Sequence, residues 1–176
     1  MRIRKATVGD AAGIARVHVD SWRTTYKGIV PDDFLANLSY DQRERFWRDI
    51  LSKPAGTSPV YVAENTSGSV IGFASGGPER SGDTVYTGEL YAIYLLSEWH
   101  RQGVGRQLTI SVVERLIQVG LTSLLIWVLA ENRSRRFYEA LGGQQVYEKP
   151  VTIGGVRLIE VAFGWPDAGT ITRGRE

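Results

Sequence analysis

The feature that most constrains this chain is an apolar run that ends in a glycine turn and continues as an apolar helix. Residues 90–96 (LYAIYLL) are apolar and aromatic, Gly103 and Gly105 follow, and apolar residues recur at every fourth position from residue 104 to residue 116. A strand, a glycine turn and a helix start leave several backbone N–H groups free at the positive end of the helix dipole. The run therefore predicts an anion-binding turn, in which glycine leaves room for a phosphate. A plain strand-to-helix turn is the alternative.

Length and composition indicate one globular domain. The 176 residues suffice for one domain with a core and are too few for two, and the hydrophobic fraction of 43% is ordinary. A net charge of +2 without clusters of Lys or Arg gives no indication of nucleic-acid binding. We expect a single domain over residues 1–166 and a flexible C-terminal tail over residues 167–176.

Several kinds of site and location are excluded or disfavoured. The chain has no cysteine, which rules out disulfides, thiolate catalysis and thiol metal ligands. Its two histidines, His18 and His100, lie far apart in the sequence, so we expect no metal site. No apolar run approaches about 18 residues and no signal-peptide core is present, so we expect a cytoplasmic protein without a membrane partner.

Local patterns predict a strand, helices, three strands, a helix, a strand, a helix and two strands. The strands are expected at residues 3–6, 60–64, 70–74, a run ending at 96, 124–129, 144–148 and 156–163. The helices are expected after Thr7, at Pro31, at Ser39 or Asp41, at Val104 and at Asn132. This order predicts a mixed sheet with helices on both faces.

Three local details complete the prediction. Thr7 and Asp10 stand three residues apart before an apolar-periodic run and are expected to form a capping pair at the helix start. In the helix that starts at Ser39 or Asp41, Phe46, Ile50 and Leu51 are expected to point inward. Residues 76–82 are expected to form a polar loop.

Two stretches together resemble the GNAT family of acetyl-CoA-dependent N-acetyltransferases. They are residues 89–106 (ELYAIYLLSEWHRQGVGR) and residues 132–142 (NRSRRFYEALG), at the distance found in that family. The likeness extends over nearly the whole chain. It implies the GNAT fold, an α+β fold whose central mixed, mostly antiparallel sheet carries helices on both faces. It also implies acetyl-CoA as co-substrate and no metal.

The first motif of the family, Gln/Arg-x-x-Gly-x-Gly/Ala, binds the CoA pyrophosphate through backbone amides. Gly103 and Gly105 match it, whereas the leading position holds His100. The resemblance implies cofactor contacts along the turn, from His100, Arg101, Gln102, Gly103, Val104, Gly105 and Arg106. The alternatives are a loop histidine at position 100 and a solvated helix arginine at position 106.

The strand before the turn pairs its backbone with pantetheine in this family. By position, Ile93, Tyr94 and Leu95 are implied, with one of their amides polarising the thioester carbonyl. A fixed N–H that meets developing negative charge stabilises a tetrahedral intermediate by about 2.7–4 kcal/mol. The alternative is that these residues only build the core, as their side chains are expected to do.

The second motif carries Asn132 and Tyr138. The resemblance implies that Asn132 binds the pantetheine arm and that Tyr138 donates a proton to the departing thiolate. A phenol with a pKa near 10 is protonated at neutral pH and suits that role. The alternatives are an N-cap at Asn132 and an aromatic that packs beside Phe137 at position 138.

An acceptor amine must lose a proton, so a base is needed. The resemblance places Glu89 where many relatives carry a catalytic or substrate-binding glutamate, which can act through water. The alternative is an exposed carboxylate at the end of a strand. His18 is a second candidate base, or simply a helix-face histidine. An aromatic wall around the acceptor is expected from Trp22, Tyr26 and Tyr91, unless these are core residues.

The sequence thus predicts direct transfer of an acetyl group from acetyl-CoA to a primary amine, with no covalent enzyme intermediate. A small-molecule amine is favoured as the acceptor, and a peptide or protein amine is second. The alternative from another class is a CoA-binding regulatory or interaction module with little turnover. Residues 156–165 are apolar enough for a homodimer through the C-terminal strands.

Overall fold

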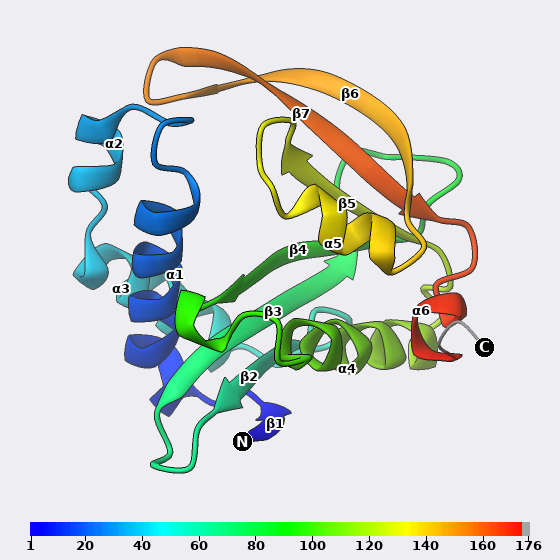
Figure 1. The fold of residues 1–176 in the computed structure, drawn as a ribbon. Helices are drawn as coiled ribbons and strands as arrows, with labels where there is room; N and C mark the ends of the chain where they lie inside the picture. The colour runs from blue at the N-terminus through cyan, green and yellow to red at the C-terminus, as the bar shows by residue number, and fades with distance from the viewer. Residues whose placement is uncertain (174–176) are drawn as a thin grey trace.

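A single twisted sheet organises the molecule, and a computed structural model describes it for residues 1–173 (Figure 1). The sheet has seven strands in the order β1-β2-β3-β4-β5-β7-β6. All neighbouring strands are antiparallel except β4 and β5, which are parallel. The strands are β1 (Arg2–Lys5), β2 (Val60–Glu64), β3 (Val70–Pro78), β4 (Gly88–Leu95), β5 (Leu124–Leu129), β6 (Gln144–Ile153) and β7 (Val156–Trp165).

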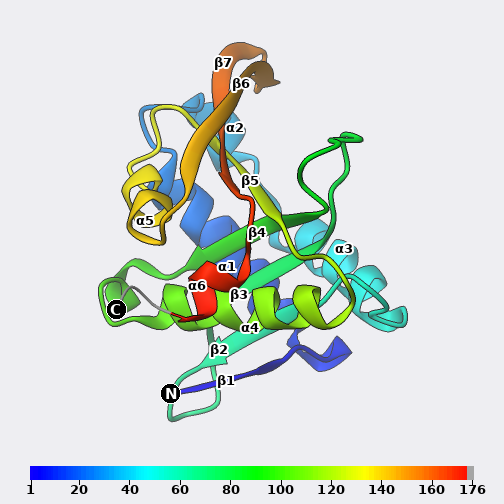
Figure 2. The same ribbon diagram turned by 90° about the vertical axis from the view of Figure 1, so that its right-hand side faces the viewer.

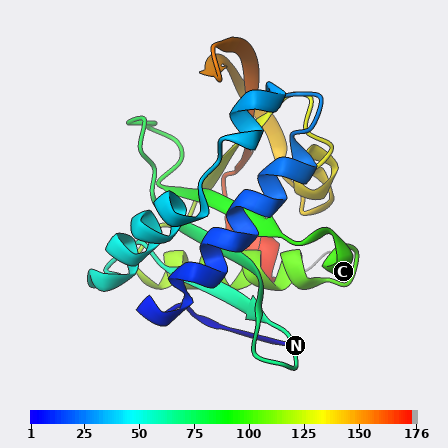
Figure 3. The same cartoon turned by 90° about the vertical axis from the view of Figure 1, so that its left-hand side faces the viewer.

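Helices cover both faces of this sheet, which confirms the predicted α+β class. The helices are α1 (Ala11–Thr25), α2 (Asp32–Ala36), α3 (Tyr40–Ser52), α4 (Val104–Gln118), α5 (Arg135–Ala140) and α6 (Gly169–Arg173). Figure 3 shows α1 crossing one face of the sheet, and Figure 2 shows α4 on the other face with α6 beside it. Short 3-10 turns precede α1 (Val8–Asp10) and follow β4 (Ser97–Trp99).

Alternation along the strands divides the core between the two faces. Phe73 of β3 packs into the cluster under α1 and α3, whereas its neighbour Ala74 belongs to the cluster under α4. Leu108 and Val112 of α4 are fully buried in that second cluster. Each face of the central strands is thus buried under helices, as their nearly continuous apolar sequences indicate.

Side-chain caps set the starts of the N-terminal helices. The Asp10 carboxylate accepts hydrogen bonds from the Thr7 amide (2.8 Å) and hydroxyl (3.0 Å), as the predicted capping pair requires. Ser39 caps α3 by accepting a hydrogen bond from the Gln42 amide at 3.2 Å. Both predicted helix starts are confirmed.

The two parallel strands part after a short common stretch. β4 and β5 pair only at Gly88–Leu124 and Glu89–Leu125. Opposite Ser75 and Gly76 of β3, the register skips one residue of β4, so Tyr91 is a bulge. Beyond this bulge, β4 leaves β5 and exposes one backbone edge toward the middle of the sheet.

Three predicted details are wrong. β3 continues to Pro78, so the strand includes the first residues of the predicted loop 76–82. In α3, Phe46 is exposed and its neighbour Trp47 is buried, because Trp47 packs edge-on against Phe73 at 4.9 Å. The helix expected at Asn132 begins only at Arg135, after a turn.

The prediction of a flexible tail from residue 167 is also wrong for the part that the structure describes. Residues 169–173 form α6, and Ile171 is buried in the main core beside α4. The Arg106 guanidinium donates a hydrogen bond to the Ile171 carbonyl at 3.2 Å. Burial of this isoleucine fixes α6 against the core. The short Gly-rich sequence around Ile171 gave no indication of this packing. Residues 174–176 lie outside the described residues.

Within residues 1–173, no helix combines the length and the apolar character needed to cross a bilayer.

Candidate active site

The predicted glycine turn is present before α4. Gly103 is the N-cap of α4 with φ of +78°, and Arg101 adopts φ of +60°. The first backbone bond of the helix runs from the Gln107 amide to the Gly103 carbonyl (3.1 Å). The amides of residues 104–106 therefore precede any intrahelical bond and point out of the helix start. A Cβ at Gly103 would meet no atom of the described chain within 4 Å, so the space before these amides is open.

The side chains of the turn contact other parts of the protein. The His100 ring lies 2.9 Å (Nε2) from the Leu95 carbonyl, and Gln102 donates to the Glu98 carbonyl at 3.0 Å. Arg106 reaches Ile171 of α6 instead of the space before the turn. Gly105 contacts Phe137, since a Cβ there would lie 3.5 Å from that ring. The backbone amides of residues 104–106, more than these side chains, are thus available to a ligand at the turn.

The exposed edge of β4 belongs to Ile93 and Leu95. The Leu96 amide bonds to the Ile71 carbonyl of β3 (3.0 Å). Because an antiparallel ladder alternates, Tyr94 opposite Phe73 also turns its amide toward β3. Ile93 and Leu95 turn their backbone groups the other way, toward the gap beside β5. The structure thus contradicts a backbone contact from Tyr94, whereas the backbone groups of Ile93 and Leu95 face the gap.

Asn132 connects the start of α5 with α1. Its side-chain oxygen accepts a hydrogen bond from the Ser134 amide at 2.8 Å, and its side-chain nitrogen lies 3.5 Å from the Tyr26 hydroxyl. The residue is buried. The predicted capping role is thus present in a turn before the helix, and it leaves Asn132 beside the gap between β4 and β5.

Tyr138 lies below the same gap, on α5. It is 6% exposed and packs edge-on against Phe137 (5.3 Å between ring centroids) and at a tilt against Phe163 (5.9 Å). Burial, with a smaller contribution from the nearby Tyr26, raises the pKa of Tyr138 above its ordinary value. Its phenol therefore keeps its proton well above neutral pH.

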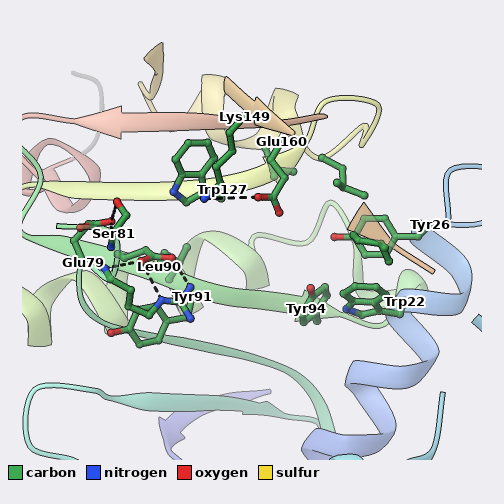
Figure 4. Close-up of a pocket in the computed structure, with 15 residues that line it drawn as sticks. Trp22, Tyr26, Glu79, Ser81, Leu90, Tyr91, Tyr94, Trp127, Lys149 and Glu160 are labelled. Atoms are coloured by element: carbon green, nitrogen blue, oxygen red, sulfur yellow. Dashed lines mark hydrogen bonds and ion pairs between the residues drawn. The ribbon is translucent and has the colours of Figure 1, made fainter. Parts of the chain in front are cut away.

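A pocket of about 410 Å³ opens on the other side of the gap, and all three predicted acceptor aromatics line it (Figure 4). Trp22 and Tyr26 come from α1 and Tyr91 from the bulge of β4. The Tyr94 side chain also reaches the pocket, where burial raises the pKa of its phenol. Tyr138, Asn132 and the turn before α4 are not among the lining residues. The pocket and the turn therefore lie at different parts of the gap.

Glu89 lines the pocket and is only 3% exposed, which contradicts the alternative of an exposed strand-end carboxylate. It is bound by Arg80, whose guanidinium nitrogens lie 2.5 Å (Nη2 to Oε1) and 3.1 Å (Nε to Oε2) away. The Arg80 amide adds a bond of 3.2 Å to Oε2. Arg80 also lies 4.1 Å above the Tyr91 ring, so Glu89 fixes a cation at one end of the pocket.

Our sequence predictions did not include four of the residues that line the pocket, namely Arg80, Trp127, Lys149 and Glu160. Arg80 lies in a polar loop, and Lys149 on the outermost strand. Glu160 was the one that a pattern could have indicated, as a single carboxylate within the apolar run 158–163 (LIEVAF). A buried-strand pattern interrupted by one charge often marks a functional side chain.

His18 does not face the pocket as a base. Trp47 donates a hydrogen bond to its Nδ1 (3.3 Å), and its ring stacks on Tyr94 at 5.1 Å. Burial, aided by the charge of Arg43, lowers the pKa of His18 to about 3. It is a neutral core residue, which confirms the helix-face alternative. No cluster of three metal-ligating side chains occurs among the described residues.

The parted strands, the free turn and the facing pocket define the architecture of an acyl-CoA-dependent transferase. Residues 16–143 match the Acetyltransferase (GNAT) family. The chain therefore belongs to the GNAT family of acetyl-CoA-dependent N-acetyltransferases, which confirms the resemblance seen in its two motifs.

Individual relatives agree with this assignment. The uncharacterized N-acetyltransferase YuaI of Bacillus subtilis is 47% identical over 169 residues, which cover 96% of this chain and 95% of that protein. The structure of PaiA N-acetyltransferase from Thermoplasma acidophilum, in complex with coenzyme A, superposes with a TM-score of 0.72 at 19% identity, covering 91% of this chain and 96% of the other. The structure of yncA, a putative acetyltransferase from Salmonella typhimurium with acetyl-CoA, gives 0.71 at 24% identity, covering 94% and 92%. At such identities these two structures establish the shared fold.

Proposed function

We propose that this enzyme binds acetyl-CoA along the turn before α4 and the free edge of β4, and transfers the acetyl group to a primary amine in the pocket. The observation that carries this proposal is the parting of β4 from β5 after Glu89 and Leu125. Among the described residues, it leaves the backbone of Ile93 and the Leu95 amide without a strand partner on the β5 side, while the Leu95 carbonyl lies 2.9 Å from His100 Nε2. A pantetheine arm can pair with this edge like an added strand.

The residues then act in a direct transfer. An amide of the free edge, from Ile93 or Leu95, polarises the thioester carbonyl. The amine nitrogen attacks that carbon, a C–N bond forms, and the C–S bond breaks as the intermediate collapses. Tyr138 donates its proton to the departing thiolate, and Asn132 holds the pantetheine arm beside it. Gly103 and Gly105 allow the pyrophosphate to approach the amides of the turn.

Of the two roles implied for Glu89, we propose substrate binding through Arg80. Both of its oxygens accept hydrogen bonds from that residue. Glu89 thereby fixes the guanidinium that closes one end of the pocket. A guanidinium in this position suits an amine substrate that carries, at the end away from the amine, a carboxylate or another oxygen that accepts hydrogen bonds.

A small-molecule amine is the favoured acceptor. A volume of about 410 Å³ is that of a small-ligand pocket, and aromatic rings line much of it. A peptide or protein amine is the second candidate, because the pocket is open at the surface and would admit one extended side chain or N-terminus. We further propose that the enzyme works in the cytoplasm, and that two copies associate through the C-terminal strands.

Thermal unfolding with and without acetyl-CoA tests cofactor binding. At one hundred times its Kd, a ligand adds about 2.7 kcal/mol to the free energy of unfolding. For a chain of this size that is a rise in Tm of about 5–11 °C. CoA release is then followed across a panel of amines. No shift in Tm would refute the cofactor site, and a shift without release on any amine would favour a binding module.

A further inference from the structure

Three carboxylates line the pocket, those of Glu79, Glu89 and Glu160, and among the described residues only Glu160 accepts no hydrogen bond. Glu79 accepts hydrogen bonds from the amide and hydroxyl of Ser81 and from the Asp83 amide. Glu89 accepts three hydrogen bonds from Arg80, which occupy both of its oxygens. Glu160 of β7 has no hydrogen bond to its side chain among the described residues. Its nearest charged contact is the Lys149 ammonium, 4.0 Å from Oε2.

Glu160 also lies at the right part of the sheet. It pairs with Leu129, the last residue of β5, at the end of that strand that has parted from β4. Its side chain is 23% exposed, and Figure 4 shows it between Trp127 and Tyr26, across the pocket from Tyr91. Glu160 therefore lies at the parted end of β5 and inside the pocket.

The protein itself shows that an ammonium fits beside Glu160. The Lys149 Nζ lies 3.8 Å from the centroid of the Trp127 ring while it contacts Glu160. A cation over an indole and beside a carboxylate is bound by both, and more strongly as water is excluded. The Lys149 side chain is 46% exposed and comes from the outermost strand, so it can swing into solvent without disturbing the core.

We propose that the acceptor ammonium binds between Trp127 and Glu160, in the place of the Lys149 ammonium, and that Glu160 accepts the proton which frees the amine for attack. The inference rests on the proposed acetyl transfer and assigns to it a cationic primary amine as substrate. Lys149 acts as a removable occupant of the subsite in the free enzyme.

Protons balance in this scheme. The ammonium gives one proton to Glu160, which frees the nitrogen lone pair, and Glu160 later releases that proton to solvent. After attack, the nitrogen loses a second proton, which replaces the one that Tyr138 gave to the thiolate. The products are the amide, free CoA thiol and one proton.

Surrounding charges suit Glu160 to this exchange. Burial raises the pKa of Glu160, and the charge of Glu89 on β4 raises it further, while Lys149 on β6 and Arg80 lower it. On the side of α1, Tyr26 faces Glu160 and stays neutral, because burial raises the pKa of its phenol. A carboxyl whose pKa is moved toward neutrality exchanges protons more readily at pH 7.

Glu160→Gln and Lys149→Met test the proposal with acetyl-CoA and a cationic amine that the wild type acetylates. Glu160→Gln should lower kcat/KM for the amine by about 10²-fold or more and remove the acidic limb of the pH profile. It should leave the rise in Tm with acetyl-CoA unchanged. Lys149→Met should lower KM for the amine several-fold, since the competing cation is gone. Glu148→Gln is the matched control. Glu148 precedes Lys149 on β6 and lies on the opposite face of that strand, so this variant should behave as the wild type.

The outcomes separate this inference from the proposed function. If the wild type neither shifts its Tm with acetyl-CoA nor releases CoA with any amine, the proposed function fails. If the wild type turns over but Glu160→Gln stays within about threefold with the same pH profile, only the present inference is overturned. An unchanged or raised KM in Lys149→Met would also overturn it, because Lys149 would then be a structural partner of Glu160. Glu160→Asp, which keeps the charge, should fall between wild type and Glu160→Gln.

Discussion

Replacing Tyr138 by Phe tests the chemistry of the leaving group with little change in structure. The tyrosine ring is buried between Phe137 and Phe163, and no hydrogen bond to its hydroxyl occurs among the described residues. A phenylalanine ring keeps these contacts and fills the same volume. The free energy of unfolding should therefore change by less than about 1 kcal/mol.

The effect on turnover should be much larger. A positioned general acid contributes about 10²–10⁴-fold to the rate, which corresponds to about 2.7–5.4 kcal/mol in the activation barrier. Because burial raises the pKa of Tyr138, its phenol is protonated throughout the neutral range, and the whole of this contribution is available there. Loss of the hydroxyl should lower kcat by that factor and leave the affinity for acetyl-CoA unchanged.

The assay is steady-state release of CoA at saturating amine, with the rise in Tm on acetyl-CoA as the measure of binding. Tyr147→Phe provides the control, since it removes the same hydroxyl from an exposed tyrosine outside the pocket. Turnover of Tyr138→Phe within about threefold of wild type would refute the role of Tyr138 as the acid. A loss of turnover together with a lost acetyl-CoA shift would place the residue in binding instead.

Three further outcomes are expected. Gly103→Ala and the control Gly68→Ala both place a Cβ at φ near +80°, so each should lower the free energy of unfolding by about 1–2 kcal/mol and the Tm by about 2–8 °C. Only Gly103→Ala should weaken acetyl-CoA binding. Equal affinities of the two variants for acetyl-CoA would contradict binding of the pyrophosphate by the backbone amides of the turn. Hydrogen bonding from Arg4 lowers the pKa of Asp10 from 3.8 to about 2. The Asp10 carboxylate therefore contributes about 1–2 kcal/mol to the free energy of unfolding above pH 4, and this contribution is lost as the pH falls toward 2. Urea midpoints of Asp10→Asn and wild type should therefore converge at low pH, and a constant difference would argue against this ion pair. Burial lowers the pKa of His18 from 6.5 to about 3, so on acidification the unfolded chain takes up a proton before the folded protein does. The free energy of unfolding therefore falls as the pH drops from 6.5 toward 3. In the same urea titration, His18→Gln should reduce the dependence of this free energy on pH between 6.5 and 5.

Much of the fold could be predicted because local patterns determine it. Apolar residues at every fourth position predict a helix from Val104, and α4 begins there. The continuous apolar run predicts a strand at residues 124–129, and β5 has these bounds. The error at Phe46 has a different origin. Two aromatics stand side by side in α3, and only the position of Phe73 on the neighbouring sheet decides that Trp47 is the buried one.

The geometry of the glycine turn and of the strand before it was predictable for the same reason. The turn and the free edge of β4 come from one continuous stretch, residues 93–106, whose conformation depends on two glycines and a helix start. Even here the assignment of Tyr94 failed. Which amide faces the gap depends on the bulge at Tyr91 and on the register with β3, and the sequence of β4 alone contains neither.

The acceptor side could be predicted only in part. Trp22, Tyr26, Tyr91 and Glu89 were expected and line the pocket, whereas the other residues were not, because separated segments build the pocket. Trp22 from α1, Arg80 from a loop, Trp127 from β5, Lys149 from β6 and Glu160 from β7 meet only after the sheet has formed. Lys149 and Glu160 become partners through the pairing of β6 with β7. Each residue alone resembles ordinary surface or core, so no motif announces it. This division has a consequence for the proposed function. The proposed cofactor site uses mainly backbone groups and should tolerate changes of side chain, whereas the proposed acceptor site uses side chains that can change singly. Exchange of Lys149 or Glu160 should therefore alter which amine is accepted without altering the use of acetyl-CoA.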